Sequence, residues 1–486
     1  MKLLPILFAS VCLFSIPRVV AETARTRPNI VVILIDDMGY GDIGPFGATK
    51  AKTPALDRMA REGMKLTSFY AAPVCSVSRA QIQTGTYGVR VSIPGVLPPA
   101  SAVGLNPEEY TVAEQLKAQG YATMCIGKWH LGDQPEFLPQ RHGYDHYFGL
   151  PYSNDMSRPK AGTNERVVPL MCDDQVVELM KNEDQSRLVR AYTDEAVKFI
   201  RTNQKQPFFL YLPHSAVHTP IHPGPEFKDH SGNGRYYDWV EECDWSVGRM
   251  LDTLRELQLD KNTLVIFTSD NGPWLVRGAD AGTSGPLRGG KGSTWEGGVR
   301  VPTVAWWPGR IPAGRTTDAV TGEIDLLPTF VNLAGGAVPT DQPIDGADIS
   351  KILLGQSEVS AREAHYFYLS YMLQAVRSGP WKLALVPQVY SMGFKETETE
   401  RGEHKPGLRL YNLDTDLGEK TDVAAQHPEV VARLKALADQ QESVLSNGSA
   451  KGPGVRPPGR VTNQKFLYPT NEETPKKGKK QATEIE

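Results

Sequence analysis

Two runs of apolar, largely β-branched residues constrain the fold of this 486-residue chain more than any other feature. Residues 29–35 read NIVVILI, and residues 263–269 read TLVIFTS. Neither run shows the polar alternation of a strand with one face in water, so both are typical of strands buried on both faces of a parallel sheet. Both runs end abruptly in acidic or amide residues: Asp36, Asp37, Asp270 and Asn271. Because ligands collect at the carboxyl ends of parallel strands, we expect these side chains to share one site.

Helical patterns alternate with the predicted strands. Thr111 and Glu114 have the spacing of a capping box, and Gly120 stands where a helix commonly ends. Apolar residues at helical spacing predict one helix over about 186–202 and another that contains residues 240–254. Two more strands are expected: residues 121–126 and 208–212. Strands alternating with helices predict an α/β sandwich with a large, mostly parallel central sheet flanked by helices.

The length of the chain exceeds what one hydrophobic core usually supports, which indicates two domains. We expect a catalytic α/β domain over residues 22–345 and a smaller C-terminal α+β subdomain over 346–446, with short strands and a last helix at 428–445. Residues 447–486 are rich in Gly, Pro and Lys, and this composition predicts a disordered tail.

The first 21 residues have the layout of a secretory signal peptide, with Lys2, an apolar run to Ile16 and small residues up to Ala21. The run is shorter than the ~18–20 apolar residues that cross a bilayer. We therefore expect cleavage near Ala21, export to the periplasm or the medium, and no stable membrane insertion. A retained anchor is the alternative. A net charge of −3 gives no indication of a nucleic-acid partner, and nothing in the sequence specifies an oligomeric state.

The pentapeptide CSVSR at residues 75–79, which continues as AQIQTG to Gly85, places a thiol before an apparent helix start and an arginine four residues later. A lone cysteine is more often buried packing material than a reactive group. At a helix start, however, an anion formed by Cys75 would face favourable backbone dipoles.

The four polar residues at the strand ends indicate a metal site. Three carboxylates in one place repel one another unless a cation lies between them, and an all-oxygen ligand set favours calcium or magnesium over zinc. Asp-Asp and Asp-Asn-Gly after a strand are also common as plain turns or helix caps, which is the alternative for each dipeptide taken alone.

Three further segments carry groups suited to anion chemistry. In GKWHLG (127–132), Lys128 and His130 are two residues apart and would project to the same side of an extended segment, where the histidine can move a proton. In PHSAVHTP (213–220), His218 precedes a turn. In LRGGKGSTWEGG (287–298), glycines allow the backbone to approach an anion that Lys291 reaches. A surface lysine, a core-edge histidine and a flexible loop are the respective alternatives.

Together these motifs resemble the type I, formylglycine-dependent sulfatase family of the alkaline phosphatase superfamily, in particular its arylsulfatase A and N-acetylgalactosamine-6-sulfatase branch. The resemblance runs from Asn29 to about Ala425 and includes GLPYSND at 149–155 and LYNLDTDLGEKTDVA at 410–424. It implies an alkaline-phosphatase-like fold and a sulfuric ester hydrolase of the arylsulfatase type that acts on a sulfated carbohydrate or an aryl sulfate.

The resemblance also implies a cofactor set. Cys75 would be oxidised by a formylglycine-generating maturation enzyme to 3-oxoalanine (formylglycine), whose hydrate is the nucleophile. The implied calcium ligands are Asp36, Asp37, Cys75, Asp270 and Asn271.

Further roles follow from the same resemblance. Arg79 and Lys128 would hold the nucleophile, Lys291 and His218 would bind the sulfate and protonate the leaving oxygen, and His130 would take a proton from the second hydroxyl of the hydrate. Two residues would complete the substrate pocket: Ser153, and His404 at its rim.

The maturation signal departs from the usual family pattern at Val77, where proline or alanine is common, and at Gln83, where leucine is common. Two alternatives to a sulfatase therefore stay open: a catalytically silent protein that binds sulfated glycans, and a phosphodiester or phosphonate hydrolase of the same superfamily. The sugar, the sulfate position and exo or endo action are not specified. Four residues near the motifs suit an anionic saccharide, but equally core packing or a solvated loop: Trp274, Arg277, Arg288 and Trp295.

Overall fold

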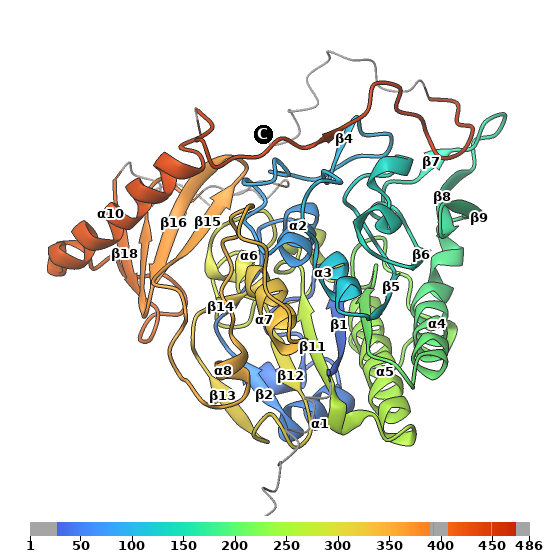
Figure 1. Ribbon diagram of the computed structural model, residues 1–486, viewed down its shortest axis with the longest axis horizontal. Coiled ribbons are helices and arrows are strands. Elements are labelled where there is room, and N and C mark those ends of the chain that lie inside the picture. The colour runs from blue at the N-terminus through green and yellow to red at the C-terminus, as the bar shows by residue number, and fades with distance from the viewer. Residues whose placement is uncertain (1–26, 389–391, 393–406, 449, 473–486) are drawn as a thin grey trace, which may run out of the picture.

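The computed structural model describes residues 27–388, 392, 407–448 and 450–472, and a large mixed sheet with helices on both faces forms its centre (Figure 1). The expected signal peptide and His404 lie outside the described residues. The sheet has 11 strands in the order β13-β2-β12-β11-β1-β10-β5-β6-β8-β7, with β9 paired to β8. Its strands are β1 (Asn29–Ile35), β2 (Met64–Leu66), β5 (Ala122–Ile126), β6 (His146–Gly149), β7 (Arg158–Pro159), β8 (Arg166–Cys172), β9 (Gln175–Met180), β10 (Phe208–Pro213), β11 (Thr263–Ser269), β12 (Thr303–Trp306) and β13 (Arg315–Thr317).

The middle of the sheet is parallel, as the sequence predicted. β1 pairs in parallel with both β10 and β11, β10 with β5, and β5 with β6. Towards the edges the sheet becomes mixed, because β12 and β8 run antiparallel to their inner neighbours. All seven residues of β1 are buried, which explains why its sequence carries no polar alternation.

Successive side chains of β1 enter two different hydrophobic cores. Ile30, Val32 and Leu34 belong to the core that the helices α3, α7 and α8 cover, whereas the alternate residues of the strand belong to the core under α1, α4 and α5. The helices are α1 (Pro54–Glu62), α2 (Cys75–Thr84), α3 (Val112–Ala118), α4 (Leu188–Thr202), α5 (Arg235–Glu256), α6 (Glu296–Val299), α7 (Leu326–Leu333), α8 (Ser350–Leu353) and α10 (Pro428–Val444). The capping box of Thr111 and Glu114 is present at the start of α3.

A second, antiparallel sheet forms the C-terminal part of the molecule. Its strands are β15 (His365–Leu369), β16 (Met372–Ser378), β17 (Trp381–Ala384) and β18 (Arg409–Asn412), and α10 packs on it through Leu434 and Ala438. Ile352 and Leu353 of α8 lie in the first core instead. The chain therefore leaves the large domain later than residue 346, where the sequence pattern placed the boundary.

The chain after residue 447 differs from the expected disordered tail over its described part. β19 (Gly459–Arg460) pairs with β4 (Val103–Gly104), Arg456 forms an ion pair with Glu109 at 2.7 Å, and Tyr468 is buried. Such short edge pairing leaves no hydrophobic periodicity in the sequence, so composition alone missed it. Among the helices that the structure describes, none combines the length and hydrophobicity needed to span a bilayer.

A buried ion pair connects the second sheet to α6 of the large domain. Lys382 Nζ, on β17, lies 2.9 Å from Glu296 Oε1 and 2.8 Å from Glu419 Oε1. All three side chains are fully buried. Burial opposes ionisation of Glu296, but Lys382, Arg300 and Arg377 outweigh it and lower its pKa to about 2. The remaining short strands lie near this interface: β3 (Phe69–Tyr70) and β14 (Thr321–Gly322).

The substitution Lys382→Met should lower the free energy of unfolding by about 3–5 kcal/mol, because it leaves two buried carboxyl groups without their shared cation. Urea unfolding followed by tryptophan fluorescence measures this change. The control is Lys435→Met, which removes an exposed ion pair with Asp439 and should cost no more than about 0.5 kcal/mol. Equal losses in the two variants would show that the buried cluster is not a special source of stability.

Candidate active site

The carboxyl ends of β1 and β11 bring four polar residues together. Ile35 is paired with Ser269, so the residues that follow the two strands are neighbours, and Asn271 Nδ2 donates to Asp37 Oδ1 at 2.7 Å. Asp37 has a left-handed backbone, with φ of 62°. Successive strand residues normally point to opposite faces, and this conformation breaks the alternation, so that Asp36 and Asp37 serve the same site.

Cys75 is the first residue of α2, and every residue of that helix is buried. The Cys75 thiol donates to Asp36 Oδ1 at 3.5 Å, and Lys291 Nζ lies 3.3 Å from the sulfur. No side chain caps the helix start, so the free backbone N–H groups contribute positive potential there. Burial, and then the neighbouring Asp36 carboxylate, raise the pKa of the thiol.

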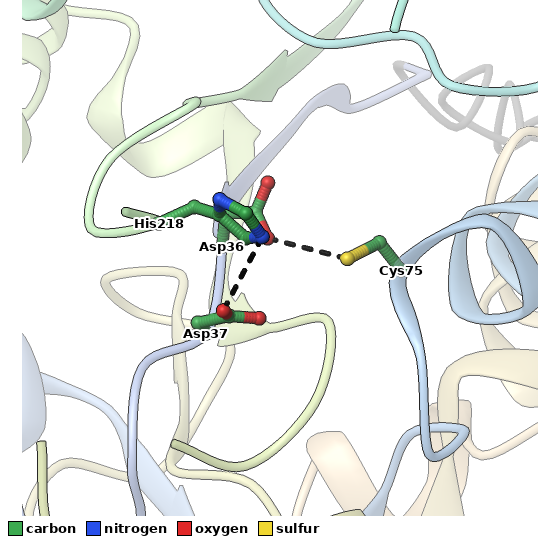
Figure 2. Close-up of side chains that lie close together, drawn as sticks. All are labelled: Asp36, Asp37, Cys75 and His218. Carbon is green, nitrogen blue, oxygen red and sulfur yellow. Dashed lines mark hydrogen bonds and ion pairs between the residues drawn. The ribbon is translucent and has the colours of Figure 1, made fainter. Parts of the chain in front are cut away.

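One group of metal-ligating side chains lies at this point. Ligand atoms of Asp36, Asp37, Cys75 and His218 all lie within 4.8 Å of one another, as Figure 2 shows. His218 Nδ1 must donate to the carbonyl of Thr219 at 2.6 Å, so Nε2 carries a lone pair when the ring is neutral. That atom faces Asp37 Oδ2 at 3.5 Å. Two facing electron-pair donors require a proton or a cation between them.

A cation would also satisfy two atoms that have no hydrogen-bond partner. Asp37 Oδ2 and Asn271 Oδ1 are both buried, and neither has a hydrogen-bond partner in the described part of the chain. Orphaned buried oxygens are rare in folded proteins, and oxygen ligands suit calcium or magnesium. The residues at this site therefore fit a hard divalent cation. Asp270 is less available, because its Oδ2 accepts from Arg79 Nη2 at 2.9 Å.

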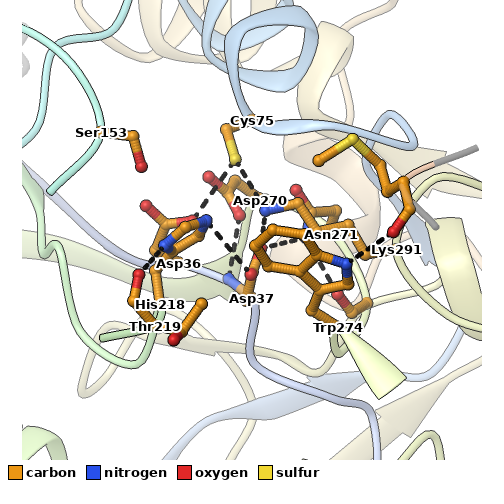
Figure 3. Close-up of polar contacts among 12 residues, drawn as sticks. Asp36, Asp37, Cys75, Ser153, His218, Thr219, Asp270, Asn271, Trp274 and Lys291 are labelled. Atoms are coloured by element: carbon orange, nitrogen blue, oxygen red, sulfur yellow. Dashed lines mark hydrogen bonds and ion pairs between the residues drawn. The ribbon is translucent and has the colours of Figure 1, made fainter. Parts of the chain in front are cut away.

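Three buried cations surround the carboxylates. Lys128 Nζ donates to Asp36, Arg79 Nη2 lies 3.3 Å from the same carboxylate, and Lys291 Nζ lies 2.6 Å from Asp37 Oδ1. Burial alone would raise the pKa of Asp36, but Lys128, His218 and Arg79 outweigh it and lower the pKa well below its ordinary value. Figure 3 shows part of this network, with Lys291, Cys75 and His218 around the residues that follow β1 and β11.

His130 interacts with this network electrostatically. Among the described residues, it has no hydrogen bond to Cys75 or Lys128. Its Nε2 donates to the carbonyl of Leu97 at 3.1 Å, and Nδ1 is buried without a partner. Burial and the neighbouring cations Lys128 and Arg79 hold the pKa of the ring well below its ordinary value. Because Nε2 donates, the free lone pair of a neutral ring lies on Nδ1. Like Asp37, His130 has a positive φ of 62°.

The substrate side of the site includes predicted and unpredicted residues. Lys128 Nζ donates to Ser153 Oγ at 3.1 Å. Asp155, two residues later, has a pKa below its ordinary value, because His218 and Lys128 outweigh the loss of water around its carboxylate. Sequence reasoning missed Asp155, although it belongs to the quoted segment GLPYSND. The segment follows β6, a strand that the sequence pattern did not predict, so its position gave no signal for Asp155.

Two tryptophans near the motifs have different surroundings. Trp274 lies beside the site, with its ring 5.4 Å from that of His218 and 4.8 Å from Lys291 Nζ. Trp295 is fully buried and packs against Tyr411 of the C-terminal sheet, with Arg288 stacked on it at 3.8 Å. Of the aromatic side chains considered for saccharide binding, Trp274 is thus available, whereas Trp295 is part of a core.

Comparisons with known proteins agree with this geometry. Residues 28–337 match the model of the sulfatase family, and residues 360–452 match the C-terminal region of aryl-sulfatase. The chain is 41% identical to N-acetylgalactosamine-6-sulfatase of Sus scrofa, with 87% of each chain covered. It is 39% identical to human arylsulfatase A, with 84% of this chain and 87% of the other covered.

A solved structure shows the same fold. The PsFucS1 sulfatase from Pseudoalteromonas sp. superimposes with a TM-score of 0.77 at 29% identity, over 85% of this chain and 90% of that one. The family match spans both sheets of the molecule and includes every strand end that contributes to the site. The chain belongs to the sulfatase family.

Proposed function

We propose that this sulfatase removes sulfate from a sulfated carbohydrate or an aryl sulfate, with formylglycine derived from Cys75 as nucleophile and calcium as cofactor. The observation that carries the proposal is the position of Cys75, at the start of a buried helix and in contact with Asp36 and Lys291. Those contacts link a potential nucleophile directly to the metal-ligating carboxylates and to a cation.

The charges of the site favour a sulfate ester once calcium is bound. Three cations, Arg79, Lys128 and Lys291, stand against the carboxylates of Asp36, Asp37 and Asp270, so their formal charges sum to zero. The calcium ion supplies two further positive charges, which attract the monoester and stabilise charge that develops on its oxygens. Its proposed ligands are Asp36, Asp37, Asp270, Asn271 and residue 75.

The two histidines suit opposite proton transfers. Burial and Lys291 lower the pKa of His218, but Asp37 opposes this effect, and the imidazolium form would protonate the leaving oxygen of the ester from Nε2. His130 holds an unprotonated Nδ1 and would accept a proton. Formylglycine at residue 75 would supply, as its hydrate, an attacking hydroxyl and a second hydroxyl, and His130 would take the proton of the second one. Arg79 and Lys128 fix Asp36 beside residue 75, and Ser153 would orient the bound sulfate.

A sulfated sugar is the proposed natural substrate class. The relative from Sus scrofa is named for a sulfated amino sugar, and Trp274 offers an aromatic face next to Lys291 on which a sugar ring could pack. His404 would contribute at the pocket rim. The N-terminal segment supports export to the periplasm or the medium, where we expect such saccharides. The encounter with the maturation enzyme would come before export is complete.

The substitution Cys75→Ala should reduce hydrolysis of 4-nitrophenyl sulfate by at least about 1,000-fold, because it removes the nucleophile. The matched control is Cys243→Ala, which changes another buried cysteine, in α5 and outside the site, and should leave kcat within about twofold. Circular dichroism checks that both variants fold. Mass spectrometry of the tryptic peptide from residues 66 to 79 should show the aldehyde in the active wild-type protein. A wild-type peptide that carries only a thiol, in protein that turns over, would reject the proposal.

Removal of calcium should abolish activity, and added calcium should restore it more effectively than magnesium, because magnesium keeps several waters and is held poorly by a buried set of protein oxygens. Calorimetric titration of the chelated protein measures binding directly. Asp37→Asn should weaken calcium binding at least ~10-fold, while the exposed control Asp174→Asn should not. Full activity in the presence of chelator would exclude calcium, and metal binding without turnover would favour a glycan-binding protein.

A further inference from the structure

A cavity of about 580 Å³ lies beside the proposed sulfate pocket. Three segments far apart in the sequence form its walls: the loop at residue 50, the start of α5, and the 3-10 helix η7 (Leu275–Asp280). The polar and aromatic residues that line it are Lys50, Asn233, Arg235, Tyr237, Arg277 and Asp280. The proposed mechanism uses none of them.

The cavity carries uncompensated positive charge. Arg235 donates to both carboxylate oxygens of Asp280, at 3.0 and 2.8 Å, so this pair is neutral overall. Lys50 Nζ lies 5.2 Å from the centre of the Tyr237 ring, and Arg277 stacks on Trp274 at 3.7 Å. Within the described ranges, neither Lys50 nor Arg277 has a carboxylate at ion-pair distance. Two exposed cations therefore face the same cavity without acidic partners.

A single side chain connects this cavity to the sulfate pocket. Trp274 contacts Arg277 of the cavity wall, and its ring also lies near both His218 and Lys291, which are proposed to bind the sulfate. Figure 3 shows Trp274 next to Lys291 and His218 at the edge of the network. Trp274 thus lies between the cavity wall and the side chains that are proposed to bind the sulfate.

We propose that the cavity binds a second anionic group of an oligosaccharide substrate while the sulfate to be removed occupies the pocket. This inference rests on the proposed function and extends it: the preferred substrate is a polyanionic saccharide. The second group is a sulfate or a sugar carboxylate, since Lys50 and Arg277 can pair with either. Tyr237 provides an aromatic face, and Asn233 provides amide hydrogen-bonding groups, for the sugar that carries it.

Charge reversal at Lys50 tests the inference, because this residue contacts neither Trp274 nor the proposed catalytic groups. Lys50→Ala should lower kcat/KM for a polysulfated oligosaccharide about fivefold, and Lys50→Glu more, while kcat/KM for 4-nitrophenyl sulfate stays unchanged. The loss should shrink as salt rises, because the cation is exposed. Lys205→Ala is the control, since this exposed lysine precedes β10 and therefore lies at the opposite end of the parallel strands.

Binding measurements separate the two sources of the second charge. Calorimetry with the inactive Cys75→Ala protein compares three oligosaccharides: one with two sulfates, one with a sulfate and a carboxylate, and one with a single sulfate and no other charge. The first two should bind more tightly than the third. The same titrations are repeated with the double variant Cys75→Ala, Lys50→Glu. The saccharide whose affinity falls in the double variant carries the group that the cavity binds.

The outcomes distinguish this inference from the function on which it rests. Wild-type protein that binds singly and doubly charged saccharides equally well would overturn the inference. So would a Lys50→Glu variant with unchanged kcat/KM on the polysulfated substrate. In either case, hydrolysis of 4-nitrophenyl sulfate would still support the sulfatase assignment. Absence of that hydrolysis in the wild-type, aldehyde-bearing protein would contradict the proposed function itself.

Discussion

The site depends on the mutual compensation of charges that are buried at the carboxyl end of the central sheet. A buried charge without a partner costs several kcal/mol, so each member of this set stabilises the others. The carboxylates hold the cations in place before any ligand arrives, which reduces the reorganisation that binding and reaction require. The groups concerned are Asp36, Asp37, Asp270, Arg79, Lys128 and Lys291.

Much of this arrangement was predictable because the sheet determines it. Strands buried on both faces need continuous apolar sequence, and the residue after such a strand emerges at the functional edge; Asp36 and Asp270 follow this rule. The left-handed backbone at Asp37 and His130 was not predictable, because neighbouring segments impose it and no local pattern requires it. The difference between Trp274, which lies beside the site, and Trp295, which is buried against the second sheet, likewise depends on tertiary packing.

The C-terminal sheet has a direct relation to the catalytic site, although it contributes no described residue to the charge network. Lys291 belongs to a glycine-rich loop, and such a loop has many accessible conformations. The same loop continues into Thr294, whose hydroxyl donates to Gln374 Oε1 at 2.8 Å and whose carbonyl accepts from Lys382 Nζ at 2.7 Å. Trp295 then enters a core formed with β17 and β18.

These contacts suggest a role for the buried Lys382 beyond the stability of its ion pairs. An ion pair replaced by apolar side chains is often no less stable, so stability alone is a weak reason for burying a cation. Here the same ammonium group contacts both Glu296 and the backbone at Thr294, three residues beyond Lys291. The second sheet thus restricts the loop that positions Lys291 against Asp37 and residue 75. The C-terminal sheet is thus linked, through Lys382 and the backbone of Thr294, to the position of the Lys291 ammonium group beside Asp37.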